Sequence, residues 1–336
     1  MAYVYRHFIP QNTAPKGATR IGVYDGNGNK VCTIPLGGLT PPTSGKLYSF
    51  GLVSDMHLYP HAAVAWKPEA KFDNALNFFE SWGCVFCAHA GDISQTGLFR
   101  ESDPDNMDVG QFAAYKEVCD AHPNLPVYGI CGNHESYVNP IKENLAELKT
   151  YMGTDLYYKV EHQNDVFIFC GQPAATTPMS DEAFDFLSET LSENSDKRCF
   201  VFVHPVWNDD SGDADGVYSN HSGLGGTLLS SWSKGTALKD LLSQYPKAIL
   251  FHGHTHIKFE EQAKDKDLNY TNKNGFHSVH IPSLSRPRDI VDNALVSAES
   301  ESQGYIVDVY DDCIVLNGWD FVRGVPAPHG TLKITT

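Results

Sequence analysis

The chain has 336 residues, of which 41% are hydrophobic and 20% charged, which is ordinary for a globular protein and excludes a disordered, collagen-like or coiled-coil chain. Asp and Glu number 41 against 25 Lys and Arg, giving a formal net charge of −16. This balance argues against a long nucleic acid as a partner, because phosphate backbones attract basic surfaces. The 15 histidines are more informative, since several stand in short clusters beside Asp, Asn and Gly.

Cysteine usage and hydropathy indicate the compartment. Most of the eight cysteines lie in apolar runs such as residues 199–203, which is typical of reduced core residues rather than of a disulfide framework. Residues 1–10 lack the apolar core of a signal peptide, and no run approaches the roughly 18 apolar residues that a membrane span needs. We therefore expect a cytoplasmic protein with no membrane segment.

Residues 1–46 differ in composition from the rest of the chain, being rich in Pro, Gly, Thr and Asn. A turn-forming stretch at 25–30 separates β-prone runs at 20–24 and 31–36. This pattern predicts a small N-terminal β extension, made of a hairpin and a linker, ahead of a second, larger domain over residues 47–336. We expect the extension to mediate protein contacts.

From residue 47 onward, short apolar strands alternate with amphipathic helices, which is typical of the α/β class. Six early strands are predicted, and their continuous apolar runs indicate burial on both faces: 48–54, 85–90, 127–131, 166–170, 200–203 and 248–252. Helical spacing predicts four buried helix faces, within 72–82, 141–152, 184–191 and 238–245. Later strands are predicted at 276–281, 304–309 and 313–317.

Polar clusters follow five of these strands. In chain order they are Ser54-Asp55-Met56-His57, Gly91-Asp92, Gly132-Asn133-His134-Glu135, His204-Pro205 and Gly253-His254-Thr255-His256. Because ligands bind outside the carboxyl ends of strands in open α/β sheets, we expect the clusters to converge on one crevice. Two Asp, one Asn and four His are too many for one tetrahedral ion but suit two Mn, Fe or Zn ions that share a carboxylate. Taken singly, the Asp and Asn residues could equally reflect ordinary turn chemistry.

The order of these motifs resembles the calcineurin-like metallophosphoesterase superfamily, over about residues 50–321. The resemblance implies a four-layer α-β-β-α sandwich of two mixed sheets. It also implies seven metal ligands. The first ion would be bound by Asp55, His57 and His256, and the second by Asn133, His204 and His254. Asp92 would bridge the two ions.

The same resemblance implies the chemistry. A hydroxide that bridges the two ions would attack phosphorus in line, and His134 would contact the phosphate and protonate the leaving oxygen. Glu135 would hold a ring N–H or the loop. We therefore expect a dinuclear metal-dependent hydrolase of a small phosphoric ester, either a phosphodiesterase, including the cyclic-nucleotide type, or a broad phosphomonoesterase. The alternative is a metal-binding structural or docking component of a larger, phage-related assembly with little turnover.

Three further residues are candidates for substrate contact. Residues 207–234 form a Gly/Ser/Asp-rich insertion that begins just after His204, and within it Asn220 and His221 are the polar side chains best suited to face a substrate. Arg286 is a candidate phosphate clamp, because guanidinium matches phosphate with two parallel hydrogen bonds. An ordinary surface ion pair on this acidic chain is the alternative for Arg286.

Overall fold

The computed structural model describes residues 20–24, 30–35, 45–59, 66–95, 111–136, 145–207, 229, 232–263, 269–292 and 294–336. Strand β1 (Arg20–Tyr24) pairs antiparallel with β2 (Lys30–Pro35), so the predicted N-terminal hairpin is confirmed. The division of the chain at residue 46 into an extension and a catalytic domain stays a prediction.

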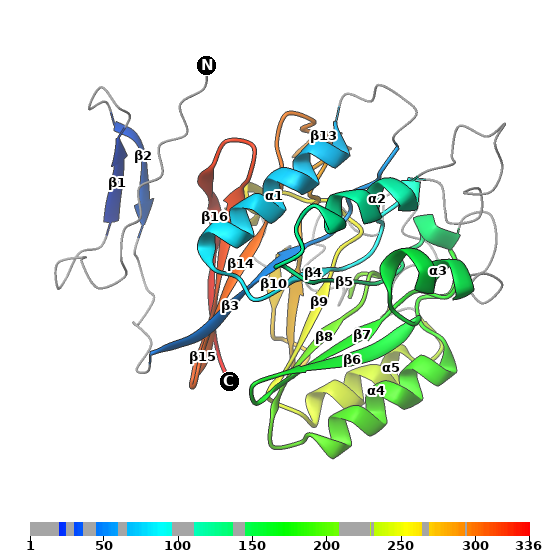
Figure 1. Cartoon of the computed structure of the whole chain (residues 1–336). Coiled ribbons are helices and arrows are strands. Elements are labelled where there is room, and N and C mark those ends of the chain that lie inside the picture. The colour runs from blue at the N-terminus through cyan, green and yellow to red at the C-terminus, as the bar shows by residue number, and fades with distance from the viewer. Residues whose placement is uncertain are drawn as a thin grey trace, which may run out of the picture.

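The first large sheet has the strand order β16-β15-β14-β3-β4-β5. Its strands are β3 (Lys46–Val53), β4 (Cys87–His89), β5 (Val127–Gly129), β14 (Gln303–Tyr310), β15 (Cys313–Asp320) and β16 (Val325–Thr335). Strands β3, β4 and β5 are parallel, whereas the other neighbours pair antiparallel, so the sheet is mixed. Three helices cover its outer face (Figure 1): α1 (Pro68–Trp82), α2 (Gln111–Asp120) and α3 (Leu145–Met152).

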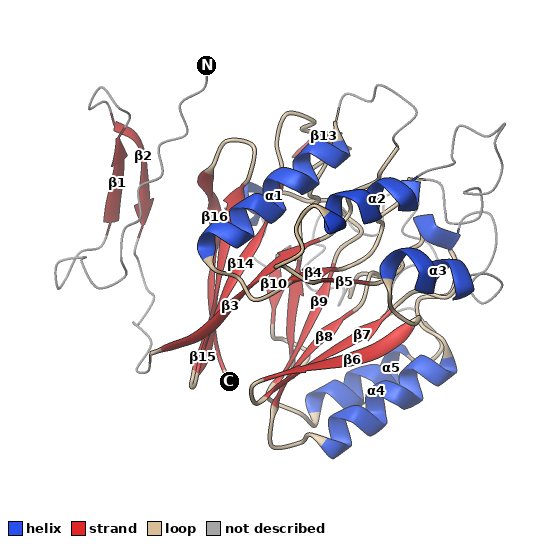
Figure 2. Cartoon of the chain, viewed as in Figure 1, coloured by secondary structure: helices blue, strands red, loops and turns tan. Residues whose placement is uncertain are grey.

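The second large sheet has the order β10-β11-β9-β8-β7-β6 and is also mixed. Its strands are β6 (Tyr157–His162), β7 (Asp165–Cys170), β8 (Arg198–Phe202), β9 (Ala248–His252), β10 (Tyr270–Thr271) and β11 (His277–His280). The four inner strands run parallel, and each edge strand is antiparallel to its neighbour. Helices α4 (Asp181–Glu193) and α5 (Gly235–Ser243) cover the outer face of this sheet (Figure 2).

Aromatic side chains fill the space between the two sheets. The ring centroids of Phe50 and Phe167 lie 5.3 Å apart, and those of Phe167 and Phe200 lie 4.7 Å apart. Burying each of these rings contributes roughly 1.5–3 kcal/mol. Separate apolar layers pack α1 to α3 on the first sheet and α4 and α5 on the second. The four-layer α-β-β-α sandwich expected from the sequence is therefore confirmed.

Some elements differ from the prediction. Leu145, assigned to a buried helix face, is the first residue of α3 and is 46% exposed, while Leu148 on the same helix is buried. Strand β16 was not predicted. Pro326 and Pro328 lack the N–H that an interior strand needs, and β16 tolerates them because it is an edge strand. Strand β6 and helix α2 were also missed. Within the described part of the chain, no helix is both long and apolar enough to cross a membrane.

Candidate metal centre

All seven predicted ligands lie on loops that follow the carboxyl ends of parallel strands. The strands and the residues that follow them are β3 with Asp55 and His57, β4 with Asp92, β5 with Asn133, β8 with His204, and β9 with His254 and His256. Hydrogen bonds between loops of the two sheets join the sheets at this edge. His204 Nδ1 donates to the carbonyl oxygen of Ala90 at 2.8 Å, and the His254 N–H donates to the Asp55 carboxylate at 3.0 Å.

The backbone of these loops is strained. Five of the seven predicted ligands have positive φ: Asp55 (56°), His57 (53°), Asp92 (53°), His254 (78°) and His256 (65°). Each such conformation costs about 1–3 kcal/mol in a residue other than glycine, and it persists only where neighbouring structure fixes it. The Asp55 N–H donates to the Gly91 carbonyl and the His57 N–H to the Asp92 carbonyl, both at 3.0 Å. The loops after β3 and β4 therefore hold each other in place.

Two glycines allow the loops to approach closely. A Cβ on Gly253 would lie 2.0 Å from Ser54 Oγ, and a Cβ on Gly132 would lie 2.2 Å from Asp92 Oδ1. Such distances are not compatible with any side chain. The glycines that precede His254 and Asn133 are thus required for the loops to meet.

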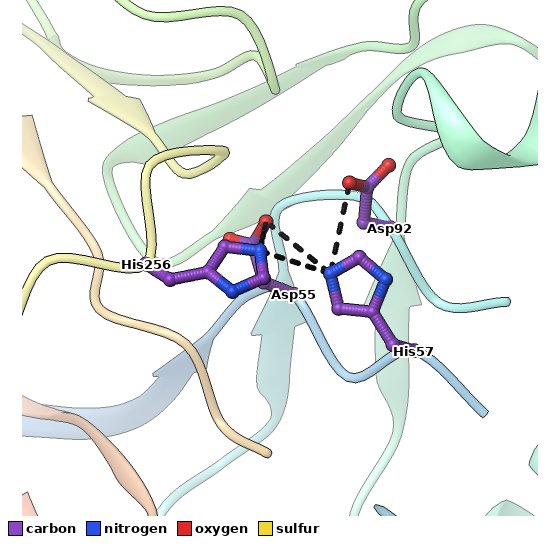
Figure 3. A group of neighbouring side chains, drawn as sticks. All are labelled: Asp55, His57, Asp92 and His256. Atoms are coloured by element: carbon purple, nitrogen blue, oxygen red, sulfur yellow. Dashed lines mark hydrogen bonds and ion pairs between the residues drawn. The ribbon is translucent and has the colours of Figure 1, made fainter. Parts of the chain in front are cut away.

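Asp55, His57, Asp92 and His256 form a first buried group, in which one ligand atom from each lies within 4.8 Å of the others (Figure 3). The Nε2 atoms of His57 and His256 lie 2.9 Å apart, and His256 Nε2 lies 3.1 Å from Asp55 Oδ1. His57 Nε2 lies 3.9 Å from Asp92 Oδ2. Burial holds the pKa of both histidines well below 6.5, so both are neutral and offer lone pairs.

Asp92, His204 and His254 form a second group on the same criterion, so Asp92 belongs to both. His204 Nε2 lies 3.1 Å from Asp92 Oδ2 and 3.3 Å from His254 Nδ1. Asn133 joins this group, because its Oδ1 lies 3.1 Å from His204 Nε2.

The hydrogen bonds and charges of both groups fit metal ions. His204 Nδ1 donates to Ala90, and His256 Nδ1 lies 3.3 Å from the Arg286 carbonyl oxygen, so in each ring Nε2 is turned toward the centre. Burial alone would lower the pKa of His204, but the Asp92 and Asp55 carboxylates outweigh it and raise the pKa to about 9. These buried carboxylates attract positive charge, which a pair of cations would supply.

His134 lies beside the ligands and is partly exposed. Its Nδ1 lies 2.5 Å from the carbonyl oxygen of Gln95, which can only accept, so Nδ1 carries a hydrogen. Its Nε2 lies 3.9 Å from Asp92 Oδ2, and its ring meets the His57 ring edge to face at 4.5 Å. Burial lowers the pKa of His134, while Asp92 and the Gln95 carbonyl oppose that shift.

Glu135 is fully buried, and its carboxylate accepts from backbone N–H groups and from the Ser94 hydroxyl rather than from a histidine ring. It accepts hydrogen bonds from the N–H groups of Gly132 at 2.5 Å, Asp92 at 3.1 Å and Ser94 at 2.7 Å. Burial and the Asp92 charge raise the pKa of Glu135 to about 7, whereas the Gly132 and Ser94 N–H groups lower it. Of the two roles expected for Glu135, the geometry therefore favours holding the loops after β4 and β5.

Of the three residues predicted to contact substrate, the structure describes Arg286. Asn220 and His221 lie outside the described residues. Arg286 lies beside the centre: its carbonyl oxygen faces His256, and its side chain contacts Trp66 and Gln95. No sequence motif marks Trp66 or Gln95. Only their closeness along the chain, of Trp66 to His57 and of Gln95 to Asp92, could have suggested them.

The family model for calcineurin-like phosphoesterases matches residues 48–258, well over half of the chain. The chain belongs to the calcineurin-like phosphoesterase family. It is accordingly a metal-dependent phosphoesterase by class, with clustered Asp and His side chains where the family has a dinuclear metal centre.

Solved structures support the fold. A dimetal phosphatase from Danio rerio is 15% identical, with a TM-score of 0.60 over 87% of this chain and 99% of that one. A purple acid phosphatase from yellow lupin (Lupinus luteus) seeds is 12% identical, with a TM-score of 0.56 over 94% of this chain and 59% of that one. No curated protein sequence matches the chain.

Proposed function

We propose that the chain hydrolyses a small phosphoric ester with two metal ions held at the strand ends. The observation that carries this proposal is the sharing of Asp92 by two buried ligand groups, because a common carboxylate is what a pair of ions needs. Asp55, His57 and His256 would hold the first ion, and Asn133, His204 and His254 the second. The donor set of imidazole, amide and carboxylate groups suits Mn, Fe or Zn.

When bound, the ions would lower the pKa of a water and neutralise charge on the phosphoryl oxygens. The chain's own side chains would position the ligand loops and supply a proton to the leaving group. Glu135 positions the loops of Asp92 and Asn133 through the backbone N–H groups it accepts from. His134 would donate a proton from Nε2 to the leaving oxygen, since its Nδ1 hydrogen is engaged by Gln95.

We propose a phosphodiester as the leading substrate class, supported by the resemblance of Gly-Asn-His-Glu and Gly-His-Thr-His to the cyclic-nucleotide phosphodiesterase branch. A phosphomonoester is the second candidate, and the names of the two phosphatases of similar fold favour it. The net charge of −16 disfavours long nucleic acids as substrates.

Hydrolysis of model esters tests the proposal. We expect Mn²⁺-loaded protein to hydrolyse bis-p-nitrophenyl phosphate faster than p-nitrophenyl phosphate, and a chelator to abolish both activities until Mn²⁺ is restored. Faster hydrolysis of the monoester would contradict the diester assignment alone. Loss of neither activity on chelation, with chelated protein shown metal-free by elemental analysis, would contradict the dinuclear mechanism.

A docking component of a larger assembly is the alternative function, and the N-terminal hairpin is the segment we would assign to protein contacts. That alternative predicts bound metal without turnover on either ester. Measuring metal content and hydrolysis on the same preparation therefore separates the two proposals.

A further inference from the structure

Three partly buried side chains form a connected group beside the metal centre: Trp66, Arg286 and Gln95. The guanidinium carbon of Arg286 lies over the Trp66 ring, 4.6 Å from its centroid. Arg286 Nη2 donates a hydrogen bond to Gln95 Oε1 at 3.1 Å. The guanidinium is thus held by a stacking contact on its face and by an acceptor at its edge. We call these three residues the Trp66 group.

The Trp66 side chain and the Gln95 backbone both tie the Trp66 group to the proposed active site. Trp66 Nε1 donates to the backbone carbonyl of His57 at 3.1 Å, and the carbonyl of Gln95 accepts from His134 Nδ1 at 2.5 Å. One end of the group is therefore fixed to a predicted ligand loop, and the other to the predicted general acid.

The backbone that carries Arg286 is fixed to the same loop. The Arg286 N–H donates to Ser283 Oγ at 2.9 Å, and that hydroxyl donates to the carbonyl of Asp55 at 2.7 Å. The Arg286 charge also acts on the site, since it is among the charges that lower the pKa of His57, His134 and His256. Both the side chain and the backbone of Arg286 thus belong to the surroundings of the ligands.

We propose that Arg286 binds the phosphoryl oxygens of the substrate and that Trp66 is the residue that positions it. Stacking uses the flat face of a guanidinium, whereas its N–H groups point outward along the edge, where phosphate oxygens bind in pairs. A stacked guanidinium also loses less rotamer freedom on binding, which favours affinity. This inference rests on the proposed function, because it requires the substrate's phosphoryl group to be held at the predicted metal centre, beside which Arg286 lies.

Binding of inorganic phosphate to Mn²⁺-loaded protein tests the assignment without relying on turnover. In Arg286→Met we expect the dissociation constant for phosphate, measured by calorimetry, to rise about 10- to 100-fold, the effect of losing charge-assisted hydrogen bonds. KM for the ester should rise in parallel while metal content stays at the wild-type value. Trp66→Leu should raise the same constants about 3- to 10-fold. Trp66→Phe, which keeps an aromatic face but not the N–H, should recover part of that loss.

Arg288→Met is the matched control for charge. Arg288 lies two residues further along, in β12 (Arg288–Val291), and its charge also lowers the pKa of His57 and His256. A rise in the phosphate constant as large as that of Arg286→Met would show a general charge effect and overturn the inference. An unchanged constant in Arg286→Met would also overturn it, while leaving the proposed function intact if the wild type hydrolyses the ester. Absence of hydrolysis by metal-loaded wild type would instead contradict the proposed function.

Discussion

Replacing Asp92 with Asn is expected to reduce the occupancy of both metal positions and to lower kcat/KM by about 10³-fold or more. Asp92 is the residue common to both ligand groups, and it is almost fully buried. The substitution keeps the shape of the side chain but removes its negative charge, so two cations would lose their shared counter-charge. Elemental analysis of protein purified in Mn²⁺ gives the occupancy, and hydrolysis of bis-p-nitrophenyl phosphate gives the rate.

Asn133→Ala is the matched variant for this experiment. Asn133 lies beside His204 in the second group only, so its loss should lower the occupancy of one position and leave the other filled. Thermal unfolding of both variants shows whether they remain folded. If Asp92→Asn and Asn133→Ala lose metal to the same extent, Asp92 does not bridge.

Replacing His134 with Ala is expected to lower kcat by about 10²–10⁴-fold while leaving both ions bound. His134 Nε2 is held near the centre by the Nδ1 hydrogen bond to Gln95, yet the residue belongs to neither ligand group. The loss should be largest for esters with poor leaving groups, because these need a proton on the departing oxygen. The measurement is a series of aryl esters of increasing leaving-group pKa, with metal content determined on each preparation.

The pH profile gives a second readout for His134. A general acid works in its protonated form, so activity should fall as the pH rises through its pKa. Because burial lowers that pKa, the falling limb of kcat/KM in the free enzyme should lie below the ordinary range of histidine. His134→Ala should lose that limb. An equal rate loss across all leaving groups, with the falling limb retained, would remove His134 from the acid role.

The fold and the convergence of the polar clusters could be predicted because both depend on local sequence pattern. Buried strands such as β8 and β9 consist mostly of apolar residues, and parallel strands bring their carboxyl ends to one edge. The polar clusters that follow those strands therefore had to meet. The expected sandwich is confirmed, and the structure places Asp55, Asp92 and His204 together with the other predicted ligands.

The surroundings of the ligands were not predictable to the same degree, because they depend on contacts between distant segments. Trp66 reaches Arg286 across 220 positions of sequence, and no motif marks either Trp66 or Gln95. Glu135 could have held a ring or a loop, and only the three-dimensional arrangement of the N–H groups decides between them. Local sequence pattern also failed to indicate strand β16, because the position of this strand at the edge of its sheet is set by tertiary structure.

The negative net charge of the chain does not exclude a small anionic substrate at this site. A formal charge of −16 describes the sum of all side chains, whereas a substrate meets the local electric field of the site where it binds. Two divalent ions would add about four positive charges at the strand ends, and Arg286 adds another. A small phosphate ester can therefore bind to an acidic protein, while a long polyanion would meet its negative surface.

The central claim is that two ions share Asp92, and anomalous X-ray scattering from crystals of Mn²⁺-loaded protein tests it most directly. We predict two anomalous peaks about 3.5–4 Å apart, one among Asp55, His57 and His256 and the other by His204 and His254, with Asp92 between them. A single peak in crystals grown with saturating Mn²⁺, or two peaks without Asp92 between them, would contradict the account.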